Sequence, residues 1–465
     1  MPITPVTDDS LFMPFPDQDP TTIASATGAA PVVTRRDFLA ASVTATGLAA
    51  AATSGAALAQ PAEIPLSARE LWQWVRVQPV ADSRQIWLDA ASATPTLRVA
   101  MAEEYRSREI QSGNLAATTG SDYWATESQR LAARFATFAG CSEDEIVFTR
   151  GTGEALSMVA AGLDLASGDE VVTTTQEHPA ALSPWLFQAR RRGIVVKQVD
   201  IPSLLTEPEQ VLTAISAACT PRTRVLAFSH VQYGDGSVLP VRELCQFARE
   251  RNIATVVDGA QAFGMLEYAL RDLGCDYYAT SFHKWLAGCH GTGMLYVRRE
   301  ALDRLWPTEP RGIDASPPIF VPAESVGQAT TPSALHKLGN VVPSLWPALR
   351  GAETALNFQE QIHRGRIEAR IRELAIYARM RLQRINGVEL QTSARPGLWA
   401  GILTFRVPGR RAADIASTLA LANGVHLRSV KWPKTDEGAL RASLHIFSSS
   451  DDIEKFGQAL QQLVK

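Results

Sequence analysis

Between Glu145 and Thr280 the sequence alternates short apolar runs with segments of helical periodicity, and this alternation restricts the fold more than any other feature. Helical segments such as 155–163, 179–192 and 241–251 separate the apolar runs. The runs that we interpret as strands are 145–149, 170–174, 194–199, 224–229, 253–257 and 277–280. Strands that alternate with helices predict an α/β fold with a mostly parallel central sheet and helices on both faces. Such sheets bind their ligands at the carboxyl ends of the strands.

The second half of the chain predicts a smaller domain of a different type. Residues 305–343 are rich in Pro, Gly and Ser, which indicates a long connecting segment, and 344–382 predicts one long helix. The later segments are shorter, with strands expected at 401–407 and 442–447 and helices at 412–423 and 451–464. We therefore expect a large domain over residues 60–340 and a small C-terminal α+β domain over 341–465.

The first 59 residues predict an export signal. Arg35-Arg36 precede a weakly apolar run of Ala, Ser, Thr and Gly that ends in Ala57-Leu58-Ala59, a small-x-small cleavage pattern. This is typical of a twin-arginine signal peptide, which predicts cleavage near Ala59, use of the twin-arginine export machinery and a periplasmic location. The alternatives are a membrane anchor, a disordered tail, or a start codon placed too early. The run is too rich in small and hydroxyl side chains for a stable membrane anchor.

Net charge and cysteine spacing argue against a nucleic-acid-binding or metal-binding function. The 465 residues carry a formal net charge of −3, which gives no support for nucleic-acid binding. The five cysteines form no Cys-x-x-Cys pair and no metal-ligand spacing, so we predict no metal site.

Lys284 and Asp258 are the residues that most directly suggest a chemistry. Asp258 ends the apolar run 252–257, and Lys284 lies on a later loop among small and aromatic residues, followed by glycines. A pyridoxal phosphate enzyme needs such a pair, because the lysine forms a Schiff base with the cofactor and the carboxylate keeps the pyridine nitrogen protonated. The alternatives are a solvated surface lysine and an aspartate that caps a helix.

The motifs around these two residues resemble the class V aminotransferase family. They are Ser-x-His-Lys-Trp-Leu from Ser281, the Gly-x-Gly that ends at Gly293, and Val-Asp-Gly-Ala-Gln from Val257. The resemblance covers nearly all of the chain after about residue 80 and is closest to the isopenicillin N epimerase-like branch. It implies a large domain of the aminotransferase type (fold type I) and pyridoxal 5′-phosphate as the cofactor.

The resemblance also assigns roles around the cofactor. Thr152 and Gly153 stand where a strand gives way to a helix, whose exposed N–H groups favour a phosphate; an ordinary helix cap is the alternative. Ser281 and His283 match phosphate-contacting positions. His178 matches a histidine that stacks on the cofactor ring in the family. The alternative is a histidine that only makes structural hydrogen bonds.

Three further positions follow from the same resemblance. Gln261 matches a residue that reaches the ring's phenolic oxygen. Arg441 matches an arginine that binds the substrate's α-carboxylate, for which its planar fork is suited, although a surface arginine is the alternative. Gln328 stands where relatives contact the neighbouring subunit's phosphate, which implies a homodimer with shared active sites.

The reaction expected is chemistry at the α-carbon of an amino acid or of an amino-acid-containing peptide, with Lys284 and His178 as the catalytic candidates. A cysteine desulfurase needs a catalytic cysteine on a loop in the region of the small domain, and no cysteine follows Cys289 in this sequence. Lys284 is expected to remove the α-proton, after which transamination, epimerisation and β-elimination, including C–S lysis, all stay open. A cofactor-binding protein without turnover is a further alternative. A nucleotide-dependent oxidoreductase is another, but Leu156 stands where a dinucleotide fingerprint needs its third glycine.

Overall fold

The computed structural model describes residues 67–465 apart from 119, 203, 309–332, 340 and 432–434. The predicted signal peptide over residues 1–59 and the predicted phosphate contact Gln328 lie outside the described residues. The domain boundary expected near residue 340 stays a prediction. Among the described helices, none combines the length and apolar character needed to cross a bilayer.

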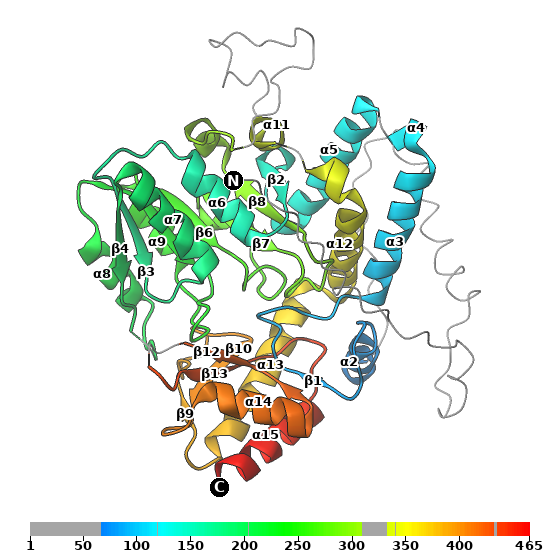
Figure 1. The fold of residues 1–465 in the computed structure, drawn as a ribbon, viewed down its shortest axis with the longest axis vertical. Coiled ribbons are helices and arrows are strands. Elements are labelled where there is room, and N and C mark those ends of the chain that lie inside the picture. Colours follow the sequence, from blue (N-terminus) through cyan, green and yellow to red (C-terminus); the bar gives the residue numbers. More distant parts are fainter. Residues whose placement is uncertain (1–66, 119, 203, 309–332, 340, 432–434) are drawn as a thin grey trace, which may run out of the picture. The chain divides into compact units, whose positions relative to one another are not determined.

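A seven-stranded sheet forms the centre of the larger part of the structure (Figure 1). Its strands follow the order β2-β8-β7-β6-β5-β3-β4. β8 runs antiparallel to both of its neighbours, and the other adjacent pairs are parallel. The predicted mostly parallel sheet is therefore confirmed. The strands are β2 (Ile146–Thr149), β3 (Glu170–Thr174), β4 (Val195–Val199), β5 (Thr223–Ser229), β6 (Ala254–Asp258), β7 (Tyr277–Ser281) and β8 (Gly293–Val297).

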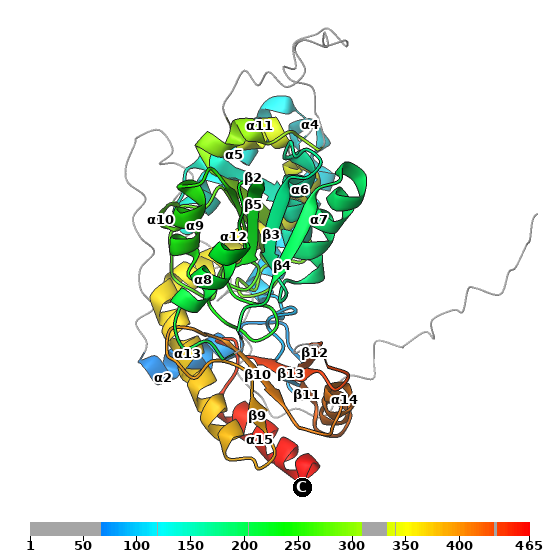
Figure 2. The ribbon, with the colours of Figure 1, turned by 90° about the vertical axis from the view of Figure 1, so that its left-hand side faces the viewer.

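Helices cover both faces of this sheet, as the edge-on view of Figure 2 shows. One face packs against α6 and α7, and the other packs against α5, α9 and α12. The helices of this part are α2 (Ala68–Arg76), α3 (Arg98–Gly113), α4 (Leu115–Thr118), α5 (Ser121–Ala139), α6 (Thr152–Gly162), α7 (Pro179–Arg192), α8 (Glu209–Ala218), α9 (Val241–Arg249), α10 (Leu270–Leu273), α11 (Ala334–Leu338) and α12 (Val342–Ile362), with the 3₁₀ helices η2 (Glu143–Glu145) and η3 (Arg299–Arg304).

The apolar runs seen in the sequence are strands that are buried on both faces. Neighbouring residues in a strand point to opposite sides, so Val256 and Tyr277 join the core under α6 and α7, whereas Val257 and Tyr278 join the core under α5, α9 and α12. A continuous apolar run, without polar alternation, is the result. Several of these strands end at polar residues, which therefore lie together at the carboxyl ends of the parallel strands.

The C-terminal part contains an antiparallel sheet in the order β12-β13-β10-β9. Helices α13 and α15 and the sheet enclose a separate apolar core that also includes residues of α14. The elements are α13 (Arg364–Gln383), β9 (Glu389–Leu390), β10 (Ile402–Arg406), α14 (Ala412–Asn423), β12 (Arg428–Val430), β13 (Ala439–Ser443) and α15 (Ser450–Val464), while β1 (Ile86–Trp87) pairs with β11 (Val425–His426). The strand predicted over 442–447 is wrong in its bounds, because the chain turns where Ser448 donates its N–H to the carbonyl of His445.

The single helix predicted over 344–382 is also wrong, since it is broken at His363. His363 has a φ of 73°, which a right-handed helix cannot accommodate, and it separates α12 from α13. The next residue, Arg364, donates hydrogen bonds to the carbonyls of Phe138 (2.7 Å) and Leu266 (3.0 Å). The break allows α12 to pack on the large core and α13 on the C-terminal core.

Candidate active site

One cavity of about 340 Å³ collects the predicted site residues of the described chain. It lies where strands of the central sheet end, next to the small antiparallel sheet. β6 and β7 end in Asp258 and Ser281, and α6 begins at Thr152 shortly after β2. The predicted residues that line the cavity are Thr152, Gly153, His178, Asp258, Gln261, Ser281, His283, Lys284 and Arg441.

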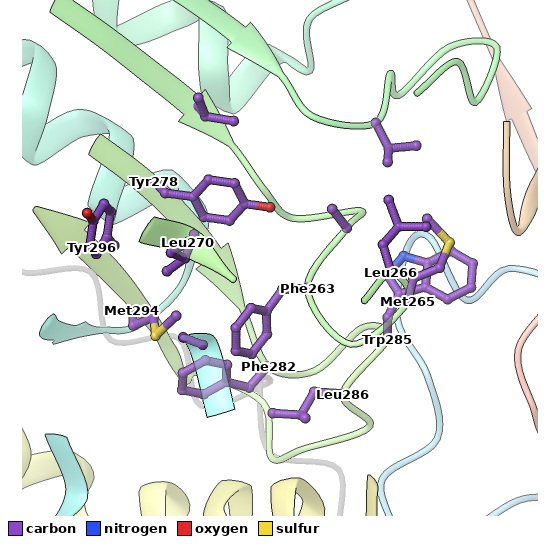
Figure 3. Close-up of a cluster of buried hydrophobic side chains, with 14 of the residues drawn as sticks. Phe263, Met265, Leu266, Leu270, Tyr278, Phe282, Trp285, Leu286, Met294 and Tyr296 are labelled. Atoms are coloured by element: carbon purple, nitrogen blue, oxygen red, sulfur yellow. The ribbon is translucent and has the colours of Figure 1, made fainter. Parts of the chain in front are cut away.

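Buried residues on both sides of Lys284 fix the loop that carries it. Phe282 and Trp285 are fully buried, and Figure 3 shows both within a cluster of apolar side chains. The indole of Trp285 donates a hydrogen bond to Oε1 of Gln261 (2.9 Å), and its carbonyl accepts one from Gln359 (2.6 Å). The lysine is therefore presented to the cavity from a rigid support.

The charges of Lys284 and Asp258 influence each other across this cavity. Burial lowers the pKa of Lys284 to about 8, and the negative charge of Asp258 opposes that shift. Burial also raises the pKa of Asp258, which the charge of Lys284 opposes. Oδ1 of Asp258 accepts the N–H of Ala260 (2.9 Å). A buried carboxylate is costly without a positively charged partner, so a protonated ring nitrogen suits this position.

Thr152 and Ser281 are hydrogen-bonded to each other at the start of α6, and His283 lines the same cavity as a further neutral group. Thr152 donates its N–H to Oγ of Ser281 (2.8 Å), and the two hydroxyl oxygens lie 2.8 Å apart. The first N–H groups of a helix have no acceptor within the helix and attract anions. His283 stacks on His290, and burial lowers the pKa of His283 to about 4. Its Nδ1 is buried and has no hydrogen-bond partner among the described residues.

His178 is held as a neutral ring at the start of α7. Its Nδ1 accepts the N–H of Ala180 (3.1 Å), so the proton of the neutral ring resides on Nε2. Burial, reinforced by nearby positive charges, lowers its pKa to about 4. The edge of the ring packs on Tyr233 at 5.0 Å between centroids. The orientation is thus fixed before any ligand binds.

Gln261 retains one hydrogen-bond donor for a ligand. Its Nε2 donates to the carbonyl of Ala91 (2.9 Å), while its Oε1 accepts from Trp285. A primary amide carries two N–H groups, so one is left over. This is consistent with the expected contact to a phenolic oxygen.

Arg441 lies on β13 and is held by residues that the sequence analysis did not identify as site residues. Its side chain is 1% exposed, and Nη2 donates to Oδ1 of Asp89 (3.0 Å) and Oγ of Ser92 (3.1 Å). Its guanidinium also lies 5.0 Å from the ring centre of Tyr233. The signal that could have identified Asp89 and Ser92 is their position just after the short strand β1. Arg428 of β12 lines the cavity as well, and no sequence motif marked it.

The cysteines are all outside this cavity as the described residues form it. Cys289, the last in sequence, is buried with its Sγ 3.8 Å from the carbonyl of Ala100, and burial raises its pKa. The described residues contain no cluster of His, Cys, Asp and Glu that could hold a metal ion.

The residues present fit pyridoxal 5′-phosphate. Among the described residues, three positively charged side chains and one carboxylate line the cavity, which favours an anionic ligand. Neutral donors at the start of α6 suit a phosphate, the unpartnered Nδ1 of His283 needs a partner, and Asp258 needs a protonated nitrogen. Lys284, with its lowered pKa, suits covalent attachment.

Comparisons with known proteins agree with this fit. The family aminotransferase class V matches residues 86–456. The chain is 34% identical over 343 residues to an isopenicillin N epimerase from Amycolatopsis lactamdurans, covering 71% of this chain and 84% of that protein. It is 35% identical over 333 residues to a probable cysteine desulfurase from Pseudomonas aeruginosa, covering 68% and 78%. A solved cysteine desulfurase from Thermococcus onnurineus NA1 has a TM-score of 0.73 and 25% identity, covering 87% of this chain and 99% of that one.

Proposed function

Since the chain belongs to the pyridoxal-phosphate-dependent class V aminotransferase family, we propose that it acts at the α-carbon of an amino acid, free or within a peptide, as an aminotransferase or epimerase. The observation that carries this proposal is the cavity itself. It combines an attachment lysine of lowered pKa, a buried carboxylate and a buried arginine, and no cysteine lines it as the described residues form it.

Each of these residues has a distinct task. The cofactor, when bound, withdraws electrons from the substrate's α-carbon and so acidifies its proton. Asp258 would hold the ring nitrogen, and His178 would pack against the ring. The group at the start of α6, made of Thr152, Gly153 and Ser281 with His283 nearby, would hold the phosphate.

Lys284 is the proposed base. A base works best when its pKa lies near the operating pH, and burial has already lowered that of Lys284 to about 8. The α-proton would move to its Nζ once the substrate amine has taken its place on the cofactor. Arg441 would orient the substrate by its α-carboxylate, and its bonds to Asp89 and Ser92 fix the guanidinium.

Relatives with two different names match the chain, isopenicillin N epimerases and probable cysteine desulfurases. A desulfurase mechanism that forms a persulfide needs a cysteine nucleophile. Because no cysteine follows Cys289 in the sequence and none lines the cavity that the described residues form, we favour chemistry that Lys284 can perform without a thiol. β-Elimination, including C–S lysis, can also proceed with Lys284 as the base and without a thiol. Release of the β-substituent would identify it.

The test is a visible absorption spectrum of the purified protein with cofactor, recorded while amino acids and short peptides are added. We expect a yellow band that borohydride reduction fixes to the peptide containing Lys284. Lys284→Ala should lose the fixed cofactor and turnover, whereas Lys455→Ala, an exposed lysine on α15, should keep both.

The products distinguish the reactions. A yellow band that bleaches with release of a keto acid identifies transamination. Inversion with deuterium uptake identifies epimerisation, and loss of a β-substituent identifies elimination. Absence of any cofactor band contradicts the proposal.

We also propose that the protein is exported to the periplasm by the twin-arginine machinery and cleaved near Ala59. The support is the sequence pattern at Arg35-Arg36 and Ala57-Leu58-Ala59. Replacing both arginines by lysine should leave an uncleaved protein in the cytoplasmic fraction, because this route requires the arginine pair. Equal periplasmic amounts of the two forms would contradict the proposal, and a co-expressed periplasmic enzyme with a different signal serves as the fractionation control.

A further inference from the structure

Arg428 stands directly opposite Arg441 in the small antiparallel sheet. β12 pairs with β13 in a register that aligns these two residues, so their side chains lie on the same face. Both line the cavity. Like charges directly opposite each other in a sheet are destabilising, so their presence at the same cavity calls for an explanation.

The two arginines differ in how their charge is matched. Arg441 is buried and its charge is balanced by Asp89 at 3.0 Å. Arg428 is exposed, and within the described residues its side chain has neither a hydrogen bond nor an ion pair. Asp258 is the one carboxylate among the described residues that line the cavity, and its charge acts on Lys284. Among the residues that the structure describes, the positive charge of Arg428 is therefore not matched by a carboxylate.

The position of Arg428 separates it from the expected phosphate group. Arg428 lies opposite Arg441 in the strand register and is among the positive charges that lower the pKa of His178, so it lies on the side of the cavity that His178 and Arg441 line. The neutral donors at the start of α6 are linked to Ser281 of β7. A ligand group that reaches Arg428 therefore belongs to the substrate.

We propose that Arg428 binds a second anionic group of the substrate, so that the preferred substrate carries one carboxylate at the α-carbon and another further along. This inference rests on the proposed function and narrows its substrate class. The second group is a carboxylate at the end of an acidic side chain or at the C-terminus of a short peptide. Arg441 holds the first carboxylate and Arg428 the second.

The test uses the holoenzyme and compares probes that differ in this one charge. Glutamate and 2-aminoadipate are titrated against their neutral side-chain amides, and dipeptides with a free C-terminus against the amidated forms, with the spectral change as the measure of binding. We expect the anionic member to bind roughly 10- to 100-fold more tightly, as a charge-assisted hydrogen bond allows. A preference among the amino acids would assign the second carboxylate to an acidic side chain, and a preference among the dipeptides would assign it to a peptide C-terminus.

Arg428→Gln should remove this preference by weakening the anionic probes and leaving the neutral ones unchanged, and Arg428→Lys should restore part of it. Arg411→Gln, an exposed arginine at the start of α14, removes the same charge away from the cavity and should keep the preference. The inference is overturned if neutral and anionic probes bind the wild-type protein equally, or if Arg428→Gln weakens both by the same factor. A holoenzyme that responds spectrally to no amino acid or peptide overturns the proposed function together with this inference.

Discussion

Burial in the fold adjusts the pKa of Lys284 towards the value that its proposed role requires. Only a neutral amine can attack the cofactor, and burial brings the pKa of this amine to about 8 from an ordinary 10.5. The rate at which cofactor attaches to the apoprotein should therefore rise with pH, reach half of its maximum near pH 8 and level off above that pH. Rapid-mixing absorbance over a pH series measures this rate. The same series with a free lysine derivative, which should keep rising to higher pH, corrects for the cofactor's own titration.

Asp258 should move this profile in a known direction. Its negative charge favours the protonated form of Lys284. Asp258→Asn should therefore move the midpoint of the rate profile below pH 8, and it should weaken cofactor binding roughly 10- to 100-fold, since a hydrogen bond to a charged group contributes about 1.5–3 kcal/mol. Asp436→Asn, an exposed aspartate, is the control. A midpoint that moves to higher pH would show that another charge governs the pKa of Lys284.

The buried pair of Asp89 and Arg441 allows a stability prediction. Asp89→Ala leaves the buried guanidinium without its counter-ion, so the free energy of unfolding should fall by about 3–5 kcal/mol. Replacing both partners, with Asp89→Leu and Arg441→Met, should recover much of this loss because no unpaired charge remains. Urea denaturation of the apoprotein measures both. Equal stability of Asp89→Ala and the wild-type protein would show that solvent, rather than Asp89, neutralises Arg441.

Sequence motifs predicted the residues at the strand ends but not their distant partners. Asp258 and Lys284 could be predicted because each follows an apolar run, and Ser281 because its motif resembles the family; the structure places all three in one cavity. Asp89 is 352 residues from Arg441 in the sequence. The position of Arg428 opposite Arg441 depends on strand register, which the short segments of this sheet do not reveal.

At the scale of elements, strand β3 begins with a buried carboxylate that joins several segments. Glu170 accepts hydrogen bonds from Lys197 on β4 (2.8 Å) and from the hydroxyls of Thr220 (2.6 Å) and Thr223 (3.1 Å). These bonds hold its pKa at about 2, below the ordinary 4.5, against the effect of burial. Glu170 therefore fastens the edge strand β4 and the start of β5 to the sheet.

A pH-dependent loss of stability should follow from this carboxylate. Because its folded pKa lies below the unfolded one, its contribution is fully present above pH 4.5 and is lost as the pH falls towards 2. Glu170→Gln should therefore lower the free energy of unfolding at pH 7, by about 1–3 kcal/mol, and by progressively less below pH 4.5. Denaturation at a series of pH values measures the difference, with the exposed Glu250→Gln as the control. A difference independent of pH would contradict the role of the charge.

A helix or strand could be predicted where its own sequence, without contacts to distant residues, determines it. Strands buried on both faces appear in the sequence as continuous apolar runs, and their order along the chain was predicted. The break between α12 and α13 was not predictable, because it depends on Arg364 meeting carbonyls of Phe138 and Leu266 in distant parts of the chain. Helical periodicity continues through His363, so the pattern alone predicted a single helix.

At the scale of the whole molecule, the phosphate side of the cavity bears on the proposed homodimer. Within the described residues of one chain, the phosphate side of the cavity offers hydroxyls, backbone N–H groups and the neutral ring of His283. A doubly charged phosphate is better matched with further donors. We propose a homodimer in which Gln328 of each subunit contacts the phosphate bound by its partner, as the resemblance implies. Light scattering of the purified protein should give twice the mass of one chain.

Mixed dimers test whether the active sites are shared. Lys284→Ala and Gln328→Ala should each impair the homodimer, the first through lost attachment and the second through weaker cofactor binding. If Gln328 acts across the interface, a mixed dimer contains one intact site, made from Lys284 of one subunit and Gln328 of the other, and activity returns. If Gln328 serves its own subunit, both sites of the mixed dimer are damaged and its activity stays at the mean of the parents. Co-expression with two affinity tags isolates the mixed form, and tagged wild-type dimers give the reference. Full activity of the Gln328→Ala homodimer would remove Gln328 from the site and leave the phosphate to the donors at the start of α6.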